Sequence, residues 1–149
     1  IIISSWYYKK STENARVPRG RIAMVFTDIQ DSTALWETDA AHMRLMLAEH
    51  DTFMRALIHK YNGYEVKTEG DAFFVAFSDP DNAILWALEV QSGLLALDWP
   101  MESDMMCIPS CEPVSKPGST QLLWQGYRVR CGIHYGTPDV IFRTDIMRG

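Results

Sequence analysis

Residues 21–33 read RIAMVFTDIQDST, and the rest of the chain is organised around this stretch. Positions 21–27 are largely apolar and rich in β-forming residues, which predicts a buried strand. Asp28 follows at the exit of that strand, and the Asp-Ser-Thr sequence at 31–33 offers the side-chain oxygens and backbone N–H groups of a helix start. A carboxylate beside a helix start that can hold an anion is what a metal–nucleotide site requires.

Length and charge narrow the class of protein. The chain has 149 residues, 47% of them hydrophobic, which is enough to bury one core. A net charge of −5 excludes a general surface for nucleic acid or acidic membranes. No apolar run approaches the roughly 20 residues of a membrane span, and the first residues do not form a signal peptide. We therefore expect one globular domain.

The three cysteines, Cys107, Cys111 and Cys131, lack metal-ligand partners at useful spacing. Such sparse and odd cysteine usage predicts a reduced, cytoplasmic protein. A disulfide between Cys107 and Cys111 stays open as an alternative.

Two long segments carry helical periodicity. One covers positions 39–61 and ends at Asn62 followed by Gly63, a pair that tolerates the left-handed conformation of a helix end. The other begins with Asp79 as cap and Pro80 as first helical residue. The first helix is expected to bury Met43, Met46, Leu47, His50, Phe53, Met54, Leu57, Ile58 and Tyr61. The second is expected to bury Ala83, Trp86, Ala87, Val90, Leu94 and Leu97.

The remaining elements are strands and one long loop. Positions 64–68 and 71–77 read as two strands joined by a two-residue, glycine-containing link, which predicts a hairpin. Positions 98–120 carry prolines and serines without periodicity, so we expect an irregular surface loop. A strand pattern returns at 122–135, and a last strand is expected to start at 139–142.

This order of elements predicts an α+β fold. A strand, a helix, a hairpin, a helix and a strand give the βαββαβ arrangement of ferredoxin-like domains, with both helices on one face of an antiparallel sheet. We assign residues 21–149 to this domain. Residues 1–20 read as an approach segment that lies outside the core.

Two aspartates stand out in this layout. Asp28 ends the first strand, and Asp71 begins the second arm of the hairpin. If the hairpin lies beside the first strand, both carboxylates reach the same edge and suit Mg²⁺, which takes one or two carboxylates together with phosphate oxygens and water. Taken singly, each aspartate is better explained as a turn residue. Taken together, beside a helix start, they favour a metal site.

The basic and histidine residues are less informative on their own. Alternation in a strand allows Lys67 and Arg130 to be solvated surface residues, although a cation near a triphosphate serves catalysis. His50 and His134 read as packed or surface histidines rather than ligands. These alternatives stay open on pattern alone.

Three motifs, FTDIQDST, YEVKTEGDAF and VRCGIHYG, together resemble the class III nucleotide cyclases. They occur in the order of that family and at similar spacing between about residues 21 and 138. The first two motifs, with Trp36 shortly after the first, look most like the catalytic domain of fungal adenylyl cyclases.

The resemblance implies a role for each matching residue. Asp28 and Asp71 match the two metal-binding aspartates, and the carbonyl of Ile29 completes the metal shell. Lys67 matches the lysine that recognises adenine, and Arg130 matches the arginine that contacts the phosphates. The remaining substrate-binding residues implied by the match are Gln30, Asp31, Ser32, Thr33 and Gly70.

The implied reaction converts ATP to 3′,5′-cyclic AMP and pyrophosphate with two Mg²⁺ ions, for which Mn²⁺ is able to substitute. The active form implied by the family is a homodimer, because the site lies between two such domains. Regulation by small GTPases and attachment to the periphery of a membrane are implied through other regions of a longer protein. No nucleic-acid partner is expected.

The match also has a gap. The family's adenine-binding aspartate and its transition-state asparagine and arginine have no counterpart here, and the neighbours of Asp145 do not fit the first of these roles. We therefore expect the N-terminal two-thirds of a cyclase domain, weakly active or inactive by itself. Two alternatives stay open, a non-catalytic cyclase-like module that binds nucleotide or dimerises and a ferredoxin-like interaction domain with accidental motifs.

Overall fold

The structure, a computed structural model, describes residues 17–138 of the chain. In chain order its elements are β1 (Ile22–Ile29), α2 (Ser32–Thr38), α3 (Ala40–Lys60), β2 (Tyr64–Glu69), β3 (Ala72–Phe77), α4 (Pro80–Leu94), the 3₁₀ helix η1 (Asp104–Cys107), β4 (Val114–Ser115), β5 (Leu122–Trp124) and β6 (Val129–Gly136). The last strand, expected to start at 139–142, and most of the approach segment at 1–20 lie outside the described residues.

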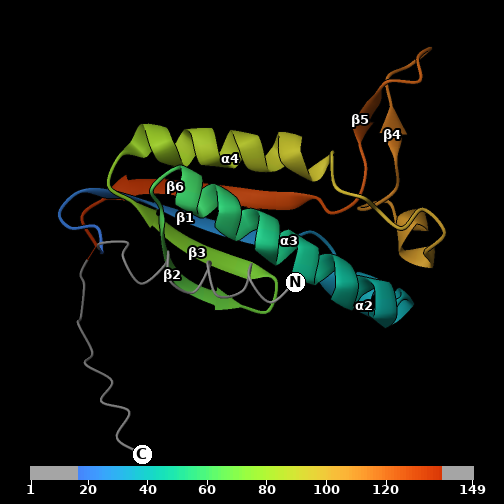
Figure 1. Ribbon diagram of the computed structural model, residues 1–149, viewed down its shortest axis with the longest axis horizontal. Coiled ribbons are helices and arrows are strands. Elements are labelled where there is room, and N and C mark those ends of the chain that lie inside the picture. The colour runs from blue at the N-terminus through green and yellow to red at the C-terminus, as the bar shows by residue number, and fades with distance from the viewer. Residues whose placement is uncertain (1–16, 139–149) are drawn as a thin grey trace, which may run out of the picture.

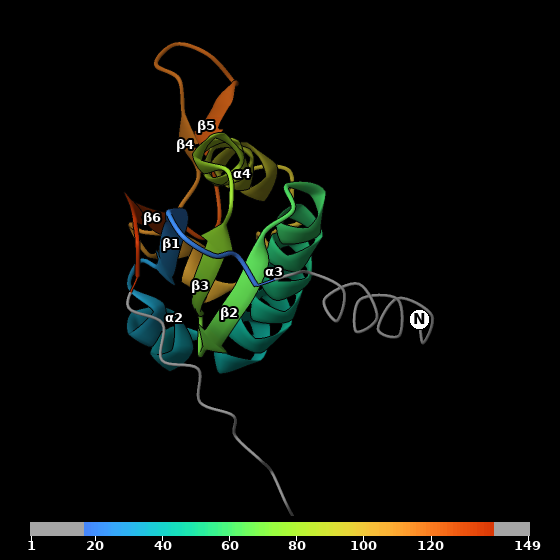
Figure 2. The same cartoon turned by 90° about the vertical axis from the view of Figure 1, so that its left-hand side faces the viewer.

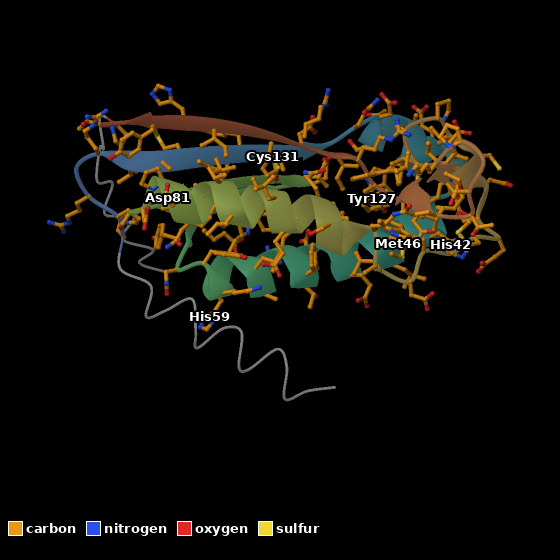
Figure 3. The ribbon with its side chains drawn as sticks, turned by 90° about the horizontal axis from the view of Figure 1, so that it is seen from above. His42, Met46, His59, Asp81, Tyr127 and Cys131 are labelled. Atoms are coloured by element: carbon orange, nitrogen blue, oxygen red, sulfur yellow. The ribbon has the colours of Figure 1, made fainter. Side chains whose placement is uncertain are left out.

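The central sheet has four antiparallel strands in the order β2-β3-β1-β6. Helices α3 and α4 run along one face of this sheet (Figure 1). In the view from above, the two helices lie on one side of the molecule, and strands β1 and β6 of the sheet lie on the other (Figure 3). The turned view shows the same single covered face (Figure 2). This two-layer arrangement confirms the α+β prediction, and it gives the sheet one covered and one open face.

The core lies between the helices and the covered face. Strand β1 contributes Ala23, Val25 and Ile29, and β3 contributes Phe73, Val75 and Phe77, all at most 1% exposed. The helices meet them with Met43, Met46, His50, Met54, Leu57 and Ile58 from α3 and Ala83, Trp86, Val90 and Leu94 from α4. These are the positions that helical spacing predicts, with Leu47, Phe53, Tyr61, Ala87 and Leu97 partly buried around them.

The predicted helix ends are also confirmed. The Asp39 side chain accepts from the His42 N–H at 3.1 Å at the start of α3, and Asp79 accepts from the Asp81 N–H at 2.9 Å at the start of α4. After α3, Asn62 adopts a left-handed φ of 53°. A Cβ at Gly63 would come within 2.7 Å of the Phe77 ring, so the residue after Asn62 must be small.

The prediction of a surface loop at 98–120 is confirmed for residues 112–120, which are exposed, and is wrong for the part before them. Trp99, Met105, Met106 and Cys111 of this segment are each at most 4% exposed and belong to the core. The burial of these apolar residues was not predicted, because they lie on turns and a single 3₁₀ turn, which have no long period. The segment closes the end of the core where α2 and α3 meet.

The predicted strand at 122–135 is interrupted. Residues Leu122–Trp124 pair with β4 in a separate two-stranded sheet, and β6 starts only at Val129. Between them Gly126 turns the chain with φ 76°, and Trp99 packs so closely that a Cβ at Gly126 would lie 1.9 Å from its ring. One glycine therefore separates two strands that share a continuous β-forming pattern.

No helix among the described residues has both the length and the apolarity needed to cross a membrane. The three cysteines carry free thiols, so the alternative disulfide between Cys107 and Cys111 is absent. Burial raises the pKa of the Cys111 thiol to about 11 and that of Cys131 likewise to about 11, which keeps both protonated at neutral pH.

Candidate functional site

The turn between β2 and β3 is fastened to the end of β1. The Ile29 N–H donates to the Asp71 carboxylate at 3.0 Å, and the Phe73 N–H donates to the Thr27 hydroxyl at 3.2 Å. The preceding residue, Gly70, has φ 63°, which lets the hairpin turn tightly at this point. Asp71 itself lies in the turn, one residue before β3, and does not start the strand as the sequence suggested.

Asp28 lies next to this anchored carboxylate along the chain. In the pairing of β1 with β6, Asp28 is opposite Arg130, and the two side chains form an ion pair. Both side chains are exposed, Asp28 to 46% and Arg130 to 64%, so the pair is on the open side of the sheet. The structure thus brings Asp28, Ile29 and Asp71 together at one corner, and Arg130 joins them.

The segment after Ile29 differs in detail from the predicted helix start. Asp31 adopts a left-handed φ of 56°, and its side chain makes no cap hydrogen bond. Its carbonyl accepts from the Leu35 N–H at 3.1 Å, which closes the first turn of α2. The Gln30 N–H donates to the Arg128 carbonyl at 2.9 Å and is therefore engaged within the protein. The N–H groups in the first turn of α2, which contains Ser32 and Thr33, have no acceptor within that helix.

Lys67 lies on the edge strand β2, at the other side of the hairpin. Its register partner is Phe74, and Phe74 is in turn opposite Phe26 of β1. The Lys67 ammonium donates to the Glu69 carboxylate at 2.7 Å, and both side chains are largely exposed. This pair lowers the pKa of the Glu69 carboxyl through the hydrogen bond from Lys67. Lys67 is therefore accessible on the open face.

The covered side of β2 is held by a different ion pair. Arg55 of α3 donates to Glu65 at 3.0 Å, and the Thr68 hydroxyl donates to the same carboxylate at 2.6 Å. The irregularity in β2 between Glu65 and Lys67 turns these two charged side chains toward opposite faces of the sheet. The edge strand is thus fixed from behind while Lys67 stays free of the core.

An aromatic pair that the sequence motifs did not indicate lies at the centre of the open face. The rings of Phe26 and Phe74 stack at 4.4 Å with an interplanar angle of 8°, and Phe26 is 54% exposed. The alternation of Phe26 with the buried Val25 and Thr27 was a signal that it faces away from the core. Lys67 lies beside Phe74 on β2, and Asp28 lies two residues along β1 from Phe26, opposite Arg130.

The donor set at the corner fits a hard divalent ion. Two carboxylates and one backbone carbonyl supply oxygen ligands, and Mg²⁺ binds through one or two carboxylates with phosphate and water completing its shell. Among residues 17–138 no cluster of three or more acidic, histidine or cysteine side chains forms a complete protein cage for a metal. Two carboxylates and one carbonyl would leave the other ligand positions of such an ion to water or a bound ligand.

Comparison with known proteins agrees with these features. The family described as the adenylate and guanylate cyclase catalytic domain matches residues 15–145. An adenylate cyclase of Podospora anserina is 46% identical over 121 residues, covering 81% of this chain and 6% of that protein. An adenylate cyclase of Schizosaccharomyces pombe is 46% identical over 120 residues, covering 80% of this chain and 7% of that protein. The chain thus spans a small part of these fungal relatives, and the resemblance to fungal adenylyl cyclases is confirmed.

A solved structure gives the same result for the fold. An adenylate cyclase of Trypanosoma brucei, described in its monomeric state, superposes with a TM-score of 0.73 at 33% sequence identity. The superposition covers 88% of this chain and 63% of that one. This chain therefore belongs to the family of adenylate and guanylate cyclase catalytic domains.

Proposed function

We propose that this chain is the metal- and phosphate-binding part of an adenylyl cyclase, which converts ATP to 3′,5′-cyclic AMP and pyrophosphate. The hydrogen bond from the Ile29 N–H to Asp71 carries the proposal, because it holds the second carboxylate beside the residue that follows Asp28. Two separate motifs, 43 positions apart at Asp28 and Asp71, thereby serve one site.

The metal-binding groups are the carboxylates of Asp28 and Asp71 and the carbonyl of Ile29. Two divalent ions, Mg²⁺ or Mn²⁺, would supply Lewis-acid stabilisation of the attacking 3′-oxygen and of the triphosphate when bound. The protein residues contribute mainly orientation, and no side-chain nucleophile is required for an in-line displacement at phosphorus.

The triphosphate is held by the segment after Ile29 and by Arg130. The first-turn N–H groups of α2 and the hydroxyls of Ser32 and Thr33 bind phosphate oxygens. The Gln30 N–H is already engaged by Arg128, so its side chain is the group left for the substrate. The Arg130 guanidinium offers a planar fork of donors that matches a phosphate.

The base is read by Lys67. Its ammonium donates hydrogen bonds only, so it favours the acceptor ring nitrogen of adenine at the position where guanine carries an N–H. In one copy Lys67 and Asp28 are separated by two strand spacings, about 10 Å across the sheet. Asp28 also lies two residues along β1 from Phe26, the β1 residue in register with Lys67. The open face is uncovered by other described elements, which supports a second copy facing it and a substrate shared between the two copies.

The test uses the full-length protein and paired aspartate variants. Asp71→Asn should lower kcat for cyclic AMP formation by about 100-fold or more, since it removes a charge that acts on the reacting phosphate. Asp79→Asn is the matched control, because Asn caps a helix as well as Asp and the residue lies at the start of α4. Activity of this control should stay within about twofold.

Two results would contradict the proposal. Full turnover by Asp71→Asn would remove the assigned role of this carboxylate. Nucleotide binding by the wild type, seen as a rise in Tm with ATP and Mn²⁺, without any cyclic AMP would instead favour the non-catalytic module.

A further inference from the structure

The ion pair between Arg130 and Asp28 occupies a group that the proposed function assigns to the metal. We propose that Arg130 is the counter-ion of Asp28 in the nucleotide-free protein, so that a divalent ion at Asp28 and a nucleoside triphosphate strengthen each other's binding. When a triphosphate is bound, the Arg130 guanidinium would pair with it, and the Asp28 carboxylate would be available to the metal. This inference rests on the proposed function and adds to it a coupling between metal binding and nucleotide binding.

The strand register makes this exchange local. Asp28 and Arg130 face each other directly across β1 and β6, and both side chains are largely solvent-exposed. Asp71, in contrast, receives a backbone N–H from Ile29. Arginine therefore neutralises one carboxylate of the corner, whereas the other is held by a neutral donor.

The structure also provides room for the guanidinium to move. Gly132 is two residues along β6 from Arg130, on the same face and opposite Phe26. A Cβ built at Gly132 would have no heavy atom within 4 Å, so the space beside Arg130 on this face is open. The arginine can leave Asp28 by a side-chain rotation without disturbing the sheet.

Charge balance determines whether metal and nucleotide strengthen or weaken each other's binding. A metal ion that binds alone displaces a cation from Asp28 and leaves that cation unpaired beside a divalent ion. A metal ion that arrives with a triphosphate brings a new anionic partner for the guanidinium. Metal and nucleotide should therefore strengthen each other's binding, by equal factors for both.

The experiment measures Mn²⁺ binding directly by electron paramagnetic resonance of the free ion. Wild-type full-length protein, Arg130→Gln and Arg128→Gln are titrated with Mn²⁺, with and without α,β-methylene ATP, which cannot be cyclised. Arg128 is the matched control, because it lies two residues earlier, is half-buried and contacts the site through its backbone carbonyl. The readout does not depend on turnover.

Arg130→Gln should bind Mn²⁺ about tenfold more tightly than wild type in the absence of nucleotide. The strengthening of Mn²⁺ binding by the ATP analogue should shrink by a similar factor. Arg128→Gln should differ from wild type by less than about twofold in both measurements. Asp28→Asn in the Arg130→Gln background should abolish the gain, since the released carboxylate is then missing.

Unchanged or weaker nucleotide-free Mn²⁺ binding in Arg130→Gln would overturn the counter-ion role. An equal gain in Arg128→Gln would also overturn it, because the effect would then reflect net charge alone. If wild type binds Mn²⁺ neither alone nor with the analogue, the proposed metal site itself fails. That result is distinct from a site that binds metal but does not respond to Arg130.

Discussion

The two faces of the central sheet differ in almost every physical respect. On the covered face, Val25 and Phe73 are at most 1% exposed and pack beneath α3 and α4. On the open face, Phe26 is 54% exposed, and Asp28, Arg130 and Lys67 carry charge into solvent. Both faces are built from the same strands, with side chains that alternate between them.

This contrast separates stability from function. The covered face gains free energy from apolar burial, so a change there should lower the free energy of unfolding. The charged pairs of the open face are solvated, and exposed ion pairs contribute about 0–1 kcal/mol. Changes there should alter binding and catalysis while the fold persists.

The largest expected effect comes from a pair of phenylalanines on opposite faces. Phe73→Ala should lower the free energy of unfolding by about 3–5 kcal/mol, because it leaves a cavity beneath α3. Phe26→Ala should cost about 1 kcal/mol or less, since its ring is half-exposed and loses mainly the stacking with Phe74. Urea denaturation of both variants measures the difference. Equal losses would show that the open face is part of the core.

Two glycine-to-alanine variants test how tightly the segment at 98–127 packs at the covered side of the sheet. Gly126→Ala should cost about 3 kcal/mol, because it combines a left-handed φ of 76° with a clash against Trp99. Gly118→Ala is the control, with a similar φ of 71° and no atom within 4 Å of the added methyl group. The control should cost about 1 kcal/mol. Thermal unfolding distinguishes the two, and similar shifts in Tm would argue against tight packing at Trp99.

Acid should weaken the attachment of this segment to α3. The Ser103 hydroxyl donates to Asp39 at 2.7 Å, and this bond, with those from His42, lowers the pKa of the Asp39 carboxyl to about 2. A lowered folded-state pKa contributes stability that is present above the ordinary value of 3.8 and is lost as the pH falls toward 2.

Ser103→Ala removes the largest cause of that shift. The Tm of this variant should therefore fall less steeply than that of wild type between pH 4 and pH 2, on the scale set by the lowered Asp39 pKa. Ser119→Ala, in the exposed turn before β5, is the control. An identical fall in Tm between pH 4 and pH 2 for wild type and Ser103→Ala would contradict the role of this hydrogen bond.

The smallest expected effect on stability belongs to Lys67→Glu on the open face. The variant replaces an exposed pair with Glu69 by two like charges, which should lower the free energy of unfolding by about 1 kcal/mol or less. In contrast, kcat/KM for ATP should fall about 100-fold, because the ammonium that donates to the base is replaced by an acceptor. Steady-state kinetics with ATP and GTP provide the measurement. Equal losses with both nucleotides would argue against a role in base choice.

Much of the fold could be predicted from local pattern. The stripe on α3, the Asp79 cap of α4 and the hairpin at Gly70 are all short-range features, and the structure confirms each. The burial of residues within 99–111 could not be predicted, because Trp99, Met105 and Cys111 reach the core from turns that have no period. Their packing depends on Tyr127, whose ring lies 4.8 Å from that of Trp99 across a gap of 28 positions in the sequence.

The candidate site divides in the same way. Asp28, Asp71, Lys67 and Arg130 were recognised from their motifs, and their roles remain predictions. Their partners within the protein were not evident from the motifs, since only the structure shows that Arg130 pairs with Asp28. The stacked rings of Phe26 and Phe74 were likewise found only in the structure.

The sequence by itself determined which residues have the chemistry of the site and which elements carry them, because strand alternation, helical spacing and turn residues act over a few positions. Only the tertiary structure decided that Asp71 is held beside Ile29, that Arg130 faces Asp28 and that one side of the sheet stays open. Those facts depend on strand order and register, which are set by packing between segments far apart in the chain.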